Sequence, residues 1–101
     1  AGRTALGTLL DALARRRVPV LLSLERGGFD YPAVDQLLGE FPRVPFVLCD
    51  VGVWGVDRYL RPLLERFPLL RVETSCLALH DAVLVPLVRR HGAGRFLFPL
   101  P

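Results

Sequence analysis

The segment Pro45-Phe-Val-Leu-Cys-Asp-Val51 is a short, almost continuous apolar run that contains a single carboxylate. Three further runs of this kind occur at a spacing of about 25 residues, at Val18–Leu24, Leu69–Ser75 and Arg95–Pro99. Apolar runs of this length are typical of strands buried on both faces, as in a parallel sheet. The four runs therefore predict four parallel strands.

Amphipathic helices are predicted before and between these runs, because apolar residues recur there every three or four positions. The predicted helices span residues 4–17, 31–41, 56–67 and from 80 or 81 to about 92. Asp30 is a good N-cap for the second helix, and Pro32 suits its first turn. Pro62 and Pro86 fall inside the third and fourth helices, where a proline kinks or breaks a helix.

The alternation of strands and helices predicts βαβ units, whose crossovers are right-handed almost without exception. Units of about 25 residues are tight for an open doubly wound sheet but suit a (β/α)8 barrel, in which eight units take ~200–250 residues. We therefore expect an α/β fold of four helix-strand units with a parallel sheet. Residues 1–101 are expected to form a single partial domain, equal to half of a TIM-type barrel.

A half-barrel leaves its first and last strands as open apolar edges. It also exposes the concave face that normally packs against the other half. We therefore expect self-association, or pairing with the missing half-barrel. The chain begins with Ala1 rather than Met, which is expected of a processed or excerpted chain.

Composition and charge exclude several classes of protein. Hydrophobic residues make up 51% of the chain and the net charge is +3, which argues against disorder. No apolar stretch reaches the ~18 residues that a bilayer requires, so no membrane partner is expected. The first residues also lack the pattern of a secretory signal.

The basic balance does not indicate a nucleic-acid partner, although the sequence pI is about 9.5. All thirteen basic residues are Arg, and Arg15–Arg17, Arg66 and Arg89–Arg90 stand at predicted helix ends, where cations complement the helix dipole. No basic stripe is interleaved with aromatic residues. Cys49 and Cys76 lie in strand-like segments without metal-ligand spacing, so a reduced, cytoplasmic setting is expected.

Functional sites of parallel α/β folds lie at the carboxyl ends of the strands. The polar residues expected at these ends are Ser23, Glu25, Asp50, Glu73 and Ser75. Three carboxylates that converge at one rim would suit acid–base chemistry or a hard divalent cation. In the alternative interpretation they are ordinary solvated residues, and Glu73 forms a weak ion pair with Arg71.

Three further side chains need an interpretation. His80 follows the third strand, and it either acts at the rim or caps the last helix. Trp54, in the loop after the second strand, either covers an apolar ligand or packs on the rim. His91 stands in the last helical turn, where a cation is favourable, and is expected to be structural.

The candidate catalytic residues are therefore Asp50 and His80. The candidate substrate-binding residues are Ser23, Glu25, Trp54, Glu73 and Ser75.

Four segments of the chain carry a resemblance to a known family. They read Arg43-Val-Pro-Phe-Val-Leu-Cys-Asp-Val-Gly52, Arg58-Tyr-Leu-Arg-Pro-Leu-Leu-Glu-Arg-Phe-Pro68, Leu70-Arg-Val-Glu-Thr-Ser75 and Leu87-Val-Arg-Arg-His-Gly-Ala-Gly-Arg-Phe-Leu-Phe98. Together they resemble the carboxyl-terminal half of the amidohydrolase-related family of TIM-barrel, metal-dependent hydrolases. The resemblance covers residues from about 18 to 101.

The resemblance implies hydrolysis of an amide, ester or lactone in a small-molecule substrate, or a related decarboxylation. In that family a divalent metal such as zinc activates the attacking water. Because a barrel site draws residues from strands around the whole ring, the half present here is expected to be inactive alone.

The metal-ligand positions depart from the family pattern. Family members often carry His where this chain has Ser23 or Leu24, and again where it has Asp50. Their last strand ends in an aspartate that has no counterpart in Phe98-Pro-Leu-Pro101. These differences favour an alternative, a non-catalytic and metal-free barrel homologue that binds a small ligand or serves in assembly. A third interpretation is a fragment without a function of its own.

Overall fold

The four apolar runs form four parallel strands, which lie in one sheet in the order of the chain. The computed structural model describes residues 2–24, 30–52, 56–77 and 80–98, with the side chains described from residue 5 onward. Within these residues the strands are β1 (Val20–Ser23), β2 (Phe46–Cys49), β3 (Arg71–Glu73) and β4 (Phe96–Leu97). The predicted α/β class and parallel sheet are confirmed, although each strand is shorter than its apolar run.

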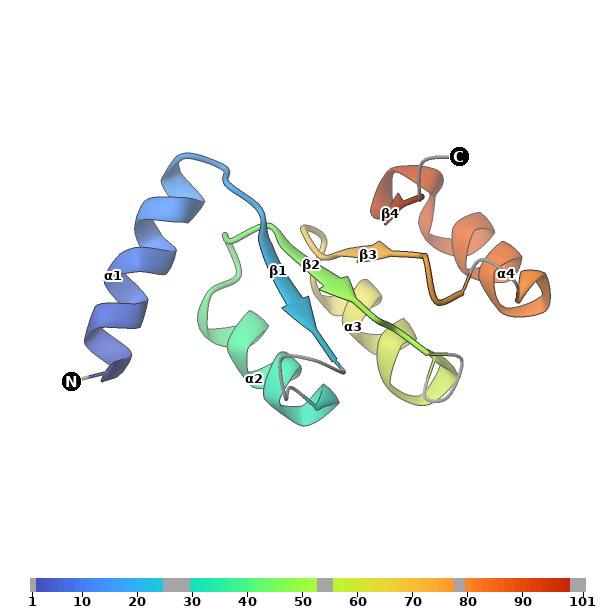
Figure 1. The fold of residues 1–101 in the computed structure, drawn as a ribbon, viewed down its shortest axis with the longest axis horizontal. Helices are drawn as coiled ribbons and strands as arrows, with labels where there is room; N and C mark the ends of the chain where they lie inside the picture. Colours follow the sequence, from blue (N-terminus) through green and yellow to red (C-terminus); the bar gives the residue numbers. More distant parts are fainter. Residues whose placement is uncertain (1, 25–29, 53–55, 78–79, 99–101) are drawn as a thin grey trace.

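Helices occupy the predicted intervals, as Figure 1 shows. They are α1 (Gly2–Arg15), α2 (Tyr31–Glu40), α3 (Arg61–Arg66) and α4 (Asp81–His91), with a π-helical segment η1 (Val56–Leu60) before α3 and a 3-10 turn η2 (Ala93–Arg95) before β4. None of the helices in the described parts of the chain is long and apolar enough to cross a membrane.

The capping signal of the second helix agrees with the structure, whereas the two prolines predicted inside helices have different outcomes. The carboxylate of Asp30 caps α2, because Oδ1 accepts a hydrogen bond of 2.9 Å from the amide of Ala33. Pro62 lies in the first turn of α3, where the helix changes from π to α, so its missing N–H costs little there. Pro86, in contrast, stands inside an uninterrupted α4.

One row of side chains crosses the whole sheet and fills the core. Leu22, Leu48, Val72 and Phe96 are paired in register from β1 to β4, and each is at most 5% exposed. These four side chains belong to the same buried cluster as apolar residues of every helix from α1 to α4. The helices therefore cover the face of the sheet to which this row points.

On the opposite face of the sheet, the described side chains range from buried to strongly exposed. Its row begins with Leu21, which is 67% exposed, and continues through Val47 to the exposed Arg71. Val47 is buried between these two neighbours. Right-handed crossovers between strands in chain order put every connecting helix on one side, so no helix of the described residues covers this second face. We call it the bare face.

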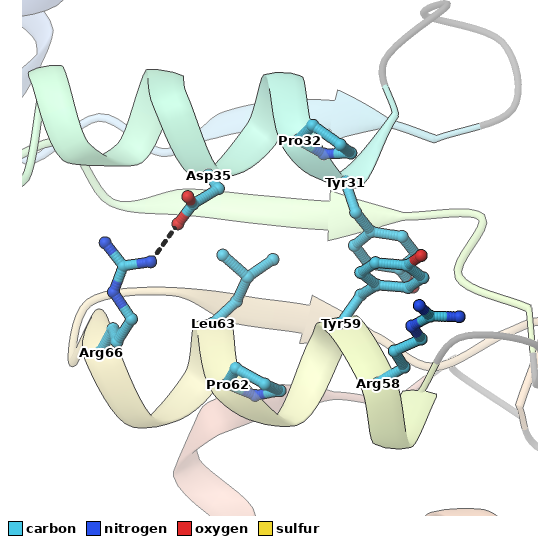
Figure 2. Close-up of a pocket in the computed structure, with 8 residues that line it drawn as sticks. All are labelled: Tyr31, Pro32, Asp35, Arg58, Tyr59, Pro62, Leu63 and Arg66. Carbon is cyan, nitrogen blue, oxygen red and sulfur yellow. Dashed lines mark hydrogen bonds and ion pairs between the residues drawn. The ribbon is translucent and has the colours of Figure 1, made fainter.

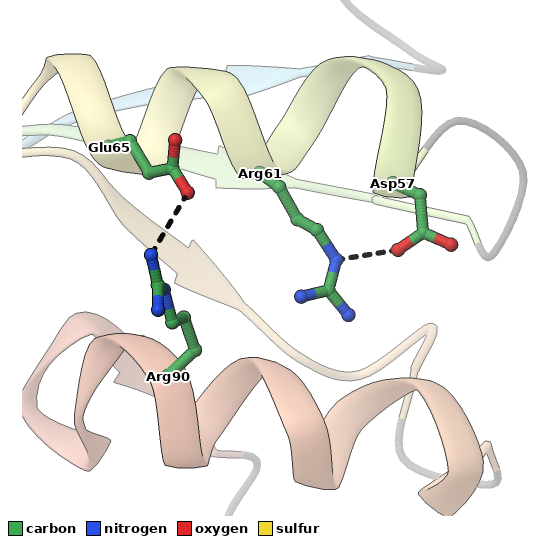
Figure 3. Close-up of polar contacts among 4 residues, drawn as sticks. All are labelled: Asp57, Arg61, Glu65 and Arg90. Atoms are coloured by element: carbon green, nitrogen blue, oxygen red, sulfur yellow. Dashed lines mark hydrogen bonds and ion pairs between the residues drawn. The ribbon is translucent and has the colours of Figure 1, made fainter.

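The helices lie side by side in chain order. A Cβ on Gly7 of α1 would meet the ring of Phe41, just after α2, at 3.8 Å. Between α3 and α4, Glu65 approaches Arg90 at 3.9 Å, and Asp57 binds Arg61 at 2.5 Å within the η1–α3 segment (Figure 3). Exposed ion pairs of this kind contribute at most about 1 kcal/mol each, so the apolar core carries most of the packing energy.

Arg95 connects the start of β4 to the end of α3. Its guanidinium donates to the backbone carbonyl oxygens of Leu64 at 3.0 Å, Phe67 at 2.8 Å and Leu70 at 2.9 Å. Carbonyls at a helix end lack intrahelical partners, so one side chain satisfies several of them. Burial is the main cause that lowers the pKa of Arg95, with Arg71 adding to it.

Candidate functional site

Ser23 and Asp50 meet at the carboxyl ends of β1 and β2. The hydroxyl of Ser23 donates a hydrogen bond of 2.5 Å to Oδ2 of Asp50, although 27 residues separate them in the chain. Both side chains are half-buried. Parallel pairing of Ser23 with Cys49 brings the two strand ends level, which places Asp50 one residue beyond the sheet. The sequence analysis expected both residues at the carboxyl ends of their strands, and there the two side chains meet.

The backbone of Asp50 explains how its carboxylate reaches Ser23. Its φ is 58°, in the left-handed region, where Asp is one of the few residues tolerated besides Gly. This conformation turns the chain sharply at the end of β2. The thiol of Cys76, in the turn after β3, lies 4.0 Å from the other carboxylate oxygen, Oδ1. The carboxylate of Asp50 therefore contacts Ser23 at the end of β1 and Cys76 after the end of β3.

The thiol of Cys49 lies beside these carboxylates. Burial raises the pKa of this thiol, and the nearby charges of Glu73 and Asp50 raise it further. A thiol with a raised pKa stays protonated at neutral pH and is a poor nucleophile. Cys49 is therefore a hydrogen donor at the rim, and its Sγ lies 3.9 Å from the carbonyl oxygen of Val47.

Glu73 and Ser75 also come together, at the end of β3. Oε1 of Glu73 accepts hydrogen bonds from the hydroxyl of Ser75 and from its amide, the latter at 2.9 Å. Arg71, the ion-pair partner considered above, donates through Nε to the carbonyl oxygen of Gly94 at 3.1 Å instead. Glu73 is thus a half-buried carboxylate held in place at the rim.

His80 lies at the same edge of the fold, at the N-cap of α4. Its carbonyl oxygen accepts hydrogen bonds of 2.9 Å from the amides of Val83 and Leu84, while the imidazole makes no cap hydrogen bond. The ring is exposed and is available to a ligand at the rim. The two other candidates, Glu25 and Trp54, lie outside the described residues.

His91 packs at the end of α4, and burial influences its charge. The helix dipole at the end of α4 favours a cation, but burial is the larger influence and lowers the pKa of His91, with Arg95 lowering it further. Its Nε2 is buried and has no hydrogen-bond partner among the described residues. His91 is therefore a neutral packing residue rather than a helix-capping cation.

The donor set at the rim does not fit the zinc ion that the family resemblance implies. Zinc takes three or four ligands from His, Cys, Asp and Glu. Within residues 2–24, 30–52, 56–77 and 80–98, no three such side chains are grouped so that they could hold a metal. The rim supplies hydroxyl, carboxylate and protonated thiol groups, which bind polar substrates by hydrogen bonds.

A hollow that the sequence did not reveal lies in the helix layer. It is a cleft of about 300 Å³ between α2 and the η1–α3 segment, and Figure 2 shows its lining. Tyr31 and Tyr59 stack there with ring centroids 5.2 Å apart, and the Arg58 guanidinium lies 5.5 Å from the Tyr59 centroid. Burial raises the pKa of Tyr31.

This cleft is closed at its other end by an ion pair. Asp35 of α2 binds Arg66 of α3 at 2.6 Å. The residues that form the cleft share no sequence motif, because stacking across two helices depends on how the helices pack. It lies on the helix layer and contains none of the rim residues.

Comparisons of the chain with protein-family models, with curated proteins and with solved structures find no match. The resemblance to the amidohydrolase-related family is carried by the four quoted sequence segments alone.

Proposed function

We propose that this chain is half of a (β/α)8-type barrel, and that its polar rim is one side of a small-molecule hydrolase site of the amidohydrolase-related type. Two features of the fold support the barrel. The strands follow chain order without a reversal, unlike a doubly wound sheet, and the helices lie on one face only.

The observation that carries the proposed function is the hydrogen bond between Ser23 and Asp50. It joins the carboxyl ends of two neighbouring strands, which is where barrel enzymes place their catalytic residues. Glu73 and Ser75 continue the polar rim on the next strand, and His80 follows them. A polar substrate at this rim would therefore meet hydrogen-bonding groups from three successive strand ends.

The chemistry assigned to Asp50 is that of a general base. The oxygen of a water molecule bonds to the carbonyl carbon of an amide, ester or lactone, and the water proton passes to the carboxylate. The carbon–nitrogen or carbon–oxygen bond then breaks, and the same proton passes to the leaving group. Ser23 orients the carboxylate, and His80 binds the leaving group or carbonyl oxygen. No step passes through a metal, because the described donor set does not fit one.

A second candidate function is ligand binding without catalysis, in a metal-free barrel homologue. One observation favours it. The rim pairs that the structure describes, Ser23 with Asp50 and Glu73 with Ser75, offer hydrogen bonds that a polar ligand can share without any reaction. In this case the rim residues hold a small polar ligand, and Asp50 contributes only hydrogen bonds.

Substitution of Asp50 by Asn tests the proposed function. Asn tolerates a positive φ as Asp does, so the turn after β2 is expected to survive while the base is lost. We expect hydrolysis of ester, lactone and amide substrates to fall by about 100-fold or more in Asp50→Asn, the scale of a lost general base. Asp11→Asn, which removes the same charge from an exposed position on α1, is the matched control.

The assay also separates the two candidates. Equal turnover in the wild type and in Asp50→Asn contradicts catalysis by Asp50. Saturable binding of a small ligand without turnover, measured by calorimetry and weakened in Asp50→Asn, supports the second candidate instead.

A further inference from the structure

The exposed apolar side chains of this chain gather at its two open edges. Among the described residues, nine large apolar side chains are exposed, and all but Tyr59 and Leu69 lie at one edge or the other. At the first edge they are Leu6 and Leu9 of α1, Val18 before β1, and Leu21 of β1. At the second they are Val85 of α4, Leu97 of β4, and Phe98 after it.

The two edges match each other layer by layer. Each edge presents apolar side chains from its outermost helix, α1 or α4, and from its outermost strand, β1 or β4. All strands run parallel, so β1 of another copy beside β4 would continue the same parallel sheet. Among the described residues, β1 and β4 are the first and last strands of the sheet, so each has a neighbouring strand on one side only.

We infer that a second copy of this chain is the partner, and that the first edge of each copy contacts the second edge of the other. A two-fold axis parallel to the strands uses this contact twice and closes an eight-stranded ring. The helices then lie outside, and the bare faces turn inward. Such a head-to-tail contact leaves no free edge, whereas any partner at one edge alone would leave the other exposed.

The charges of the bare face permit its burial in this ring. Arg71 and Glu73 lie two residues apart on β3, both on the bare face, and their charges have opposite sign. Their charged heads are already bound near opposite ends of the sheet, Arg71 to the carbonyl of Gly94 and Glu73 to Ser75. The middle of the face is left to Leu21 and Val47 on the neighbouring strands.

The ring also completes the site, and this part of the inference rests on the proposed function. Because all strands are parallel, the rims of both copies open at the same end. Two Ser23–Asp50 pairs, one from each copy, then surround a common mouth, and neither copy alone forms a closed site.

Sedimentation of the full chain tests the inference. The wild type is expected to have twice the mass of the 11.3 kDa chain. Leu21→Arg and Leu97→Glu each place a charge at one edge, and each is expected to weaken the dimer by about 100-fold or more. Leu69→Arg, on an exposed leucine in the turn before the inner strand β3, is the control and should leave the dimer intact.

Combination of the two edge substitutions gives the sharper result. In the double variant Leu21→Arg/Leu97→Glu, a head-to-tail contact brings Arg beside Glu at both junctions, so dimerisation is expected to recover by at least tenfold over either single variant. A contact of like edges would bring like charges together and prevent recovery. Far-UV circular dichroism verifies that each variant is folded.

Three outcomes would overturn the inference: a monomeric wild type, open polymers in place of a dimer, or a dimer that neither edge substitution weakens. The proposed function fails separately. A dimer that neither hydrolyses a substrate nor binds a ligand refutes the proposed function and leaves the ring in place. A monomer with Asp50-dependent turnover refutes the ring alone.

Discussion

Burial decides the protonation of two side chains in this fold. Cys49 keeps its proton because burial and two neighbouring carboxylates disfavour the thiolate. His91 loses its proton more readily than usual because burial and Arg95 disfavour the imidazolium. In both cases the charged form is the costly one, as expected for groups removed from water. The consequence for His91 is a dependence of stability on pH.

The unfolded chain binds a proton at His91 with the ordinary pKa of 6.5, and the folded chain binds it only at lower pH. Above 6.5 the residue is neutral in both states and its contribution to stability is complete. As the pH falls from 6.5 through the lower pKa of the folded state, the unfolded state gains the proton first and stability is lost.

Substitution of His91 by Gln is expected to reduce this loss of stability at low pH. Urea unfolding at about pH 7.5 and about pH 5.5 measures it as the difference between the two midpoints, which should be smaller in His91→Gln than in the wild type. His80→Gln, at an exposed imidazole, is the control and should keep the wild-type difference. An unchanged difference in His91→Gln would contradict the assignment.

At the scale of the element, α1 ends in a common helix-capping motif, but Arg17 occupies a position in it where the backbone conformation favours Gly. The amide of Val18 donates to the carbonyl of Leu13 at 2.9 Å, and that of Arg17 donates to Ala14 at 3.1 Å. This pair of hydrogen bonds is the Schellman arrangement, in which the residue after the cap is left-handed. Here that residue is Arg17, with a φ of 54°, where Gly is usual.

Arg17→Gly is therefore expected to stabilise the protein by about 0.5–1 kcal/mol, because it removes the steric strain of a side chain at positive φ. Arg16→Gly is the matched control. Arg16 is not in the left-handed conformation, and its amide donates to Ala12 as in a regular helix. The control, one residue beyond α1, should be destabilised, because Gly there adds entropy to the unfolded chain and relieves no strain. Urea unfolding measures both, and two changes of the same sign would refute the explanation.

The elements themselves were predictable to different degrees. The continuous apolar runs located all four strands, but the first run is longer than β1: Val18 lies two residues before the strand, and Leu24 follows it with one last hydrogen bond to Cys49 of β2. An apolar run indicates which residues are buried but not which backbone groups are hydrogen-bonded, so it could not show where each strand begins and ends. The sequence also did not reveal that the third helix begins with a π-helical segment, because its apolar residues recur with the spacing of an α-helix.

The site was predictable where it depends on the sheet and not where it depends on loops. Parallel strands end at one edge, so the meeting of Ser23 with Asp50 follows from the topology. The approach of Cys76 to Asp50 depends on the path of the turn after β3, which no pattern of residues specified. The lowered pKa of His91 required knowledge of burial, because its position on the helix shows only that a cation is favourable there.

At the scale of the whole molecule, one buried cluster joins every helix to the sheet. Leu48 lies at its centre, fully buried on β2 between β1 and β3. A single cluster of this kind unfolds as one unit in a domain of this size. Damage at its centre should therefore lower the stability of the whole chain.

Leu48→Ala is expected to cost about 3–4 kcal/mol, since it removes a fully buried side chain and leaves a cavity. Leu69→Ala, at a leucine that is 42% exposed in the turn before β3, should cost about 1 kcal/mol or less. Urea unfolding followed by far-UV circular dichroism gives both values. Similar costs for the two variants would show that the sheet centre does not carry the stability.

The order of the strands has a further consequence, for how the chain folds as it is made. Each core residue of a strand finds its partner about 25 residues away, Leu22 with Leu48, Leu48 with Val72, and Val72 with Phe96. Closing a short loop costs less entropy than closing a long one, so contacts of this range form early. Each unit can thus dock on its predecessor as it leaves the ribosome. In the proposed ring, only the junction of β4 with β1 must wait for a second molecule, which makes the last step of assembly the only one that depends on concentration.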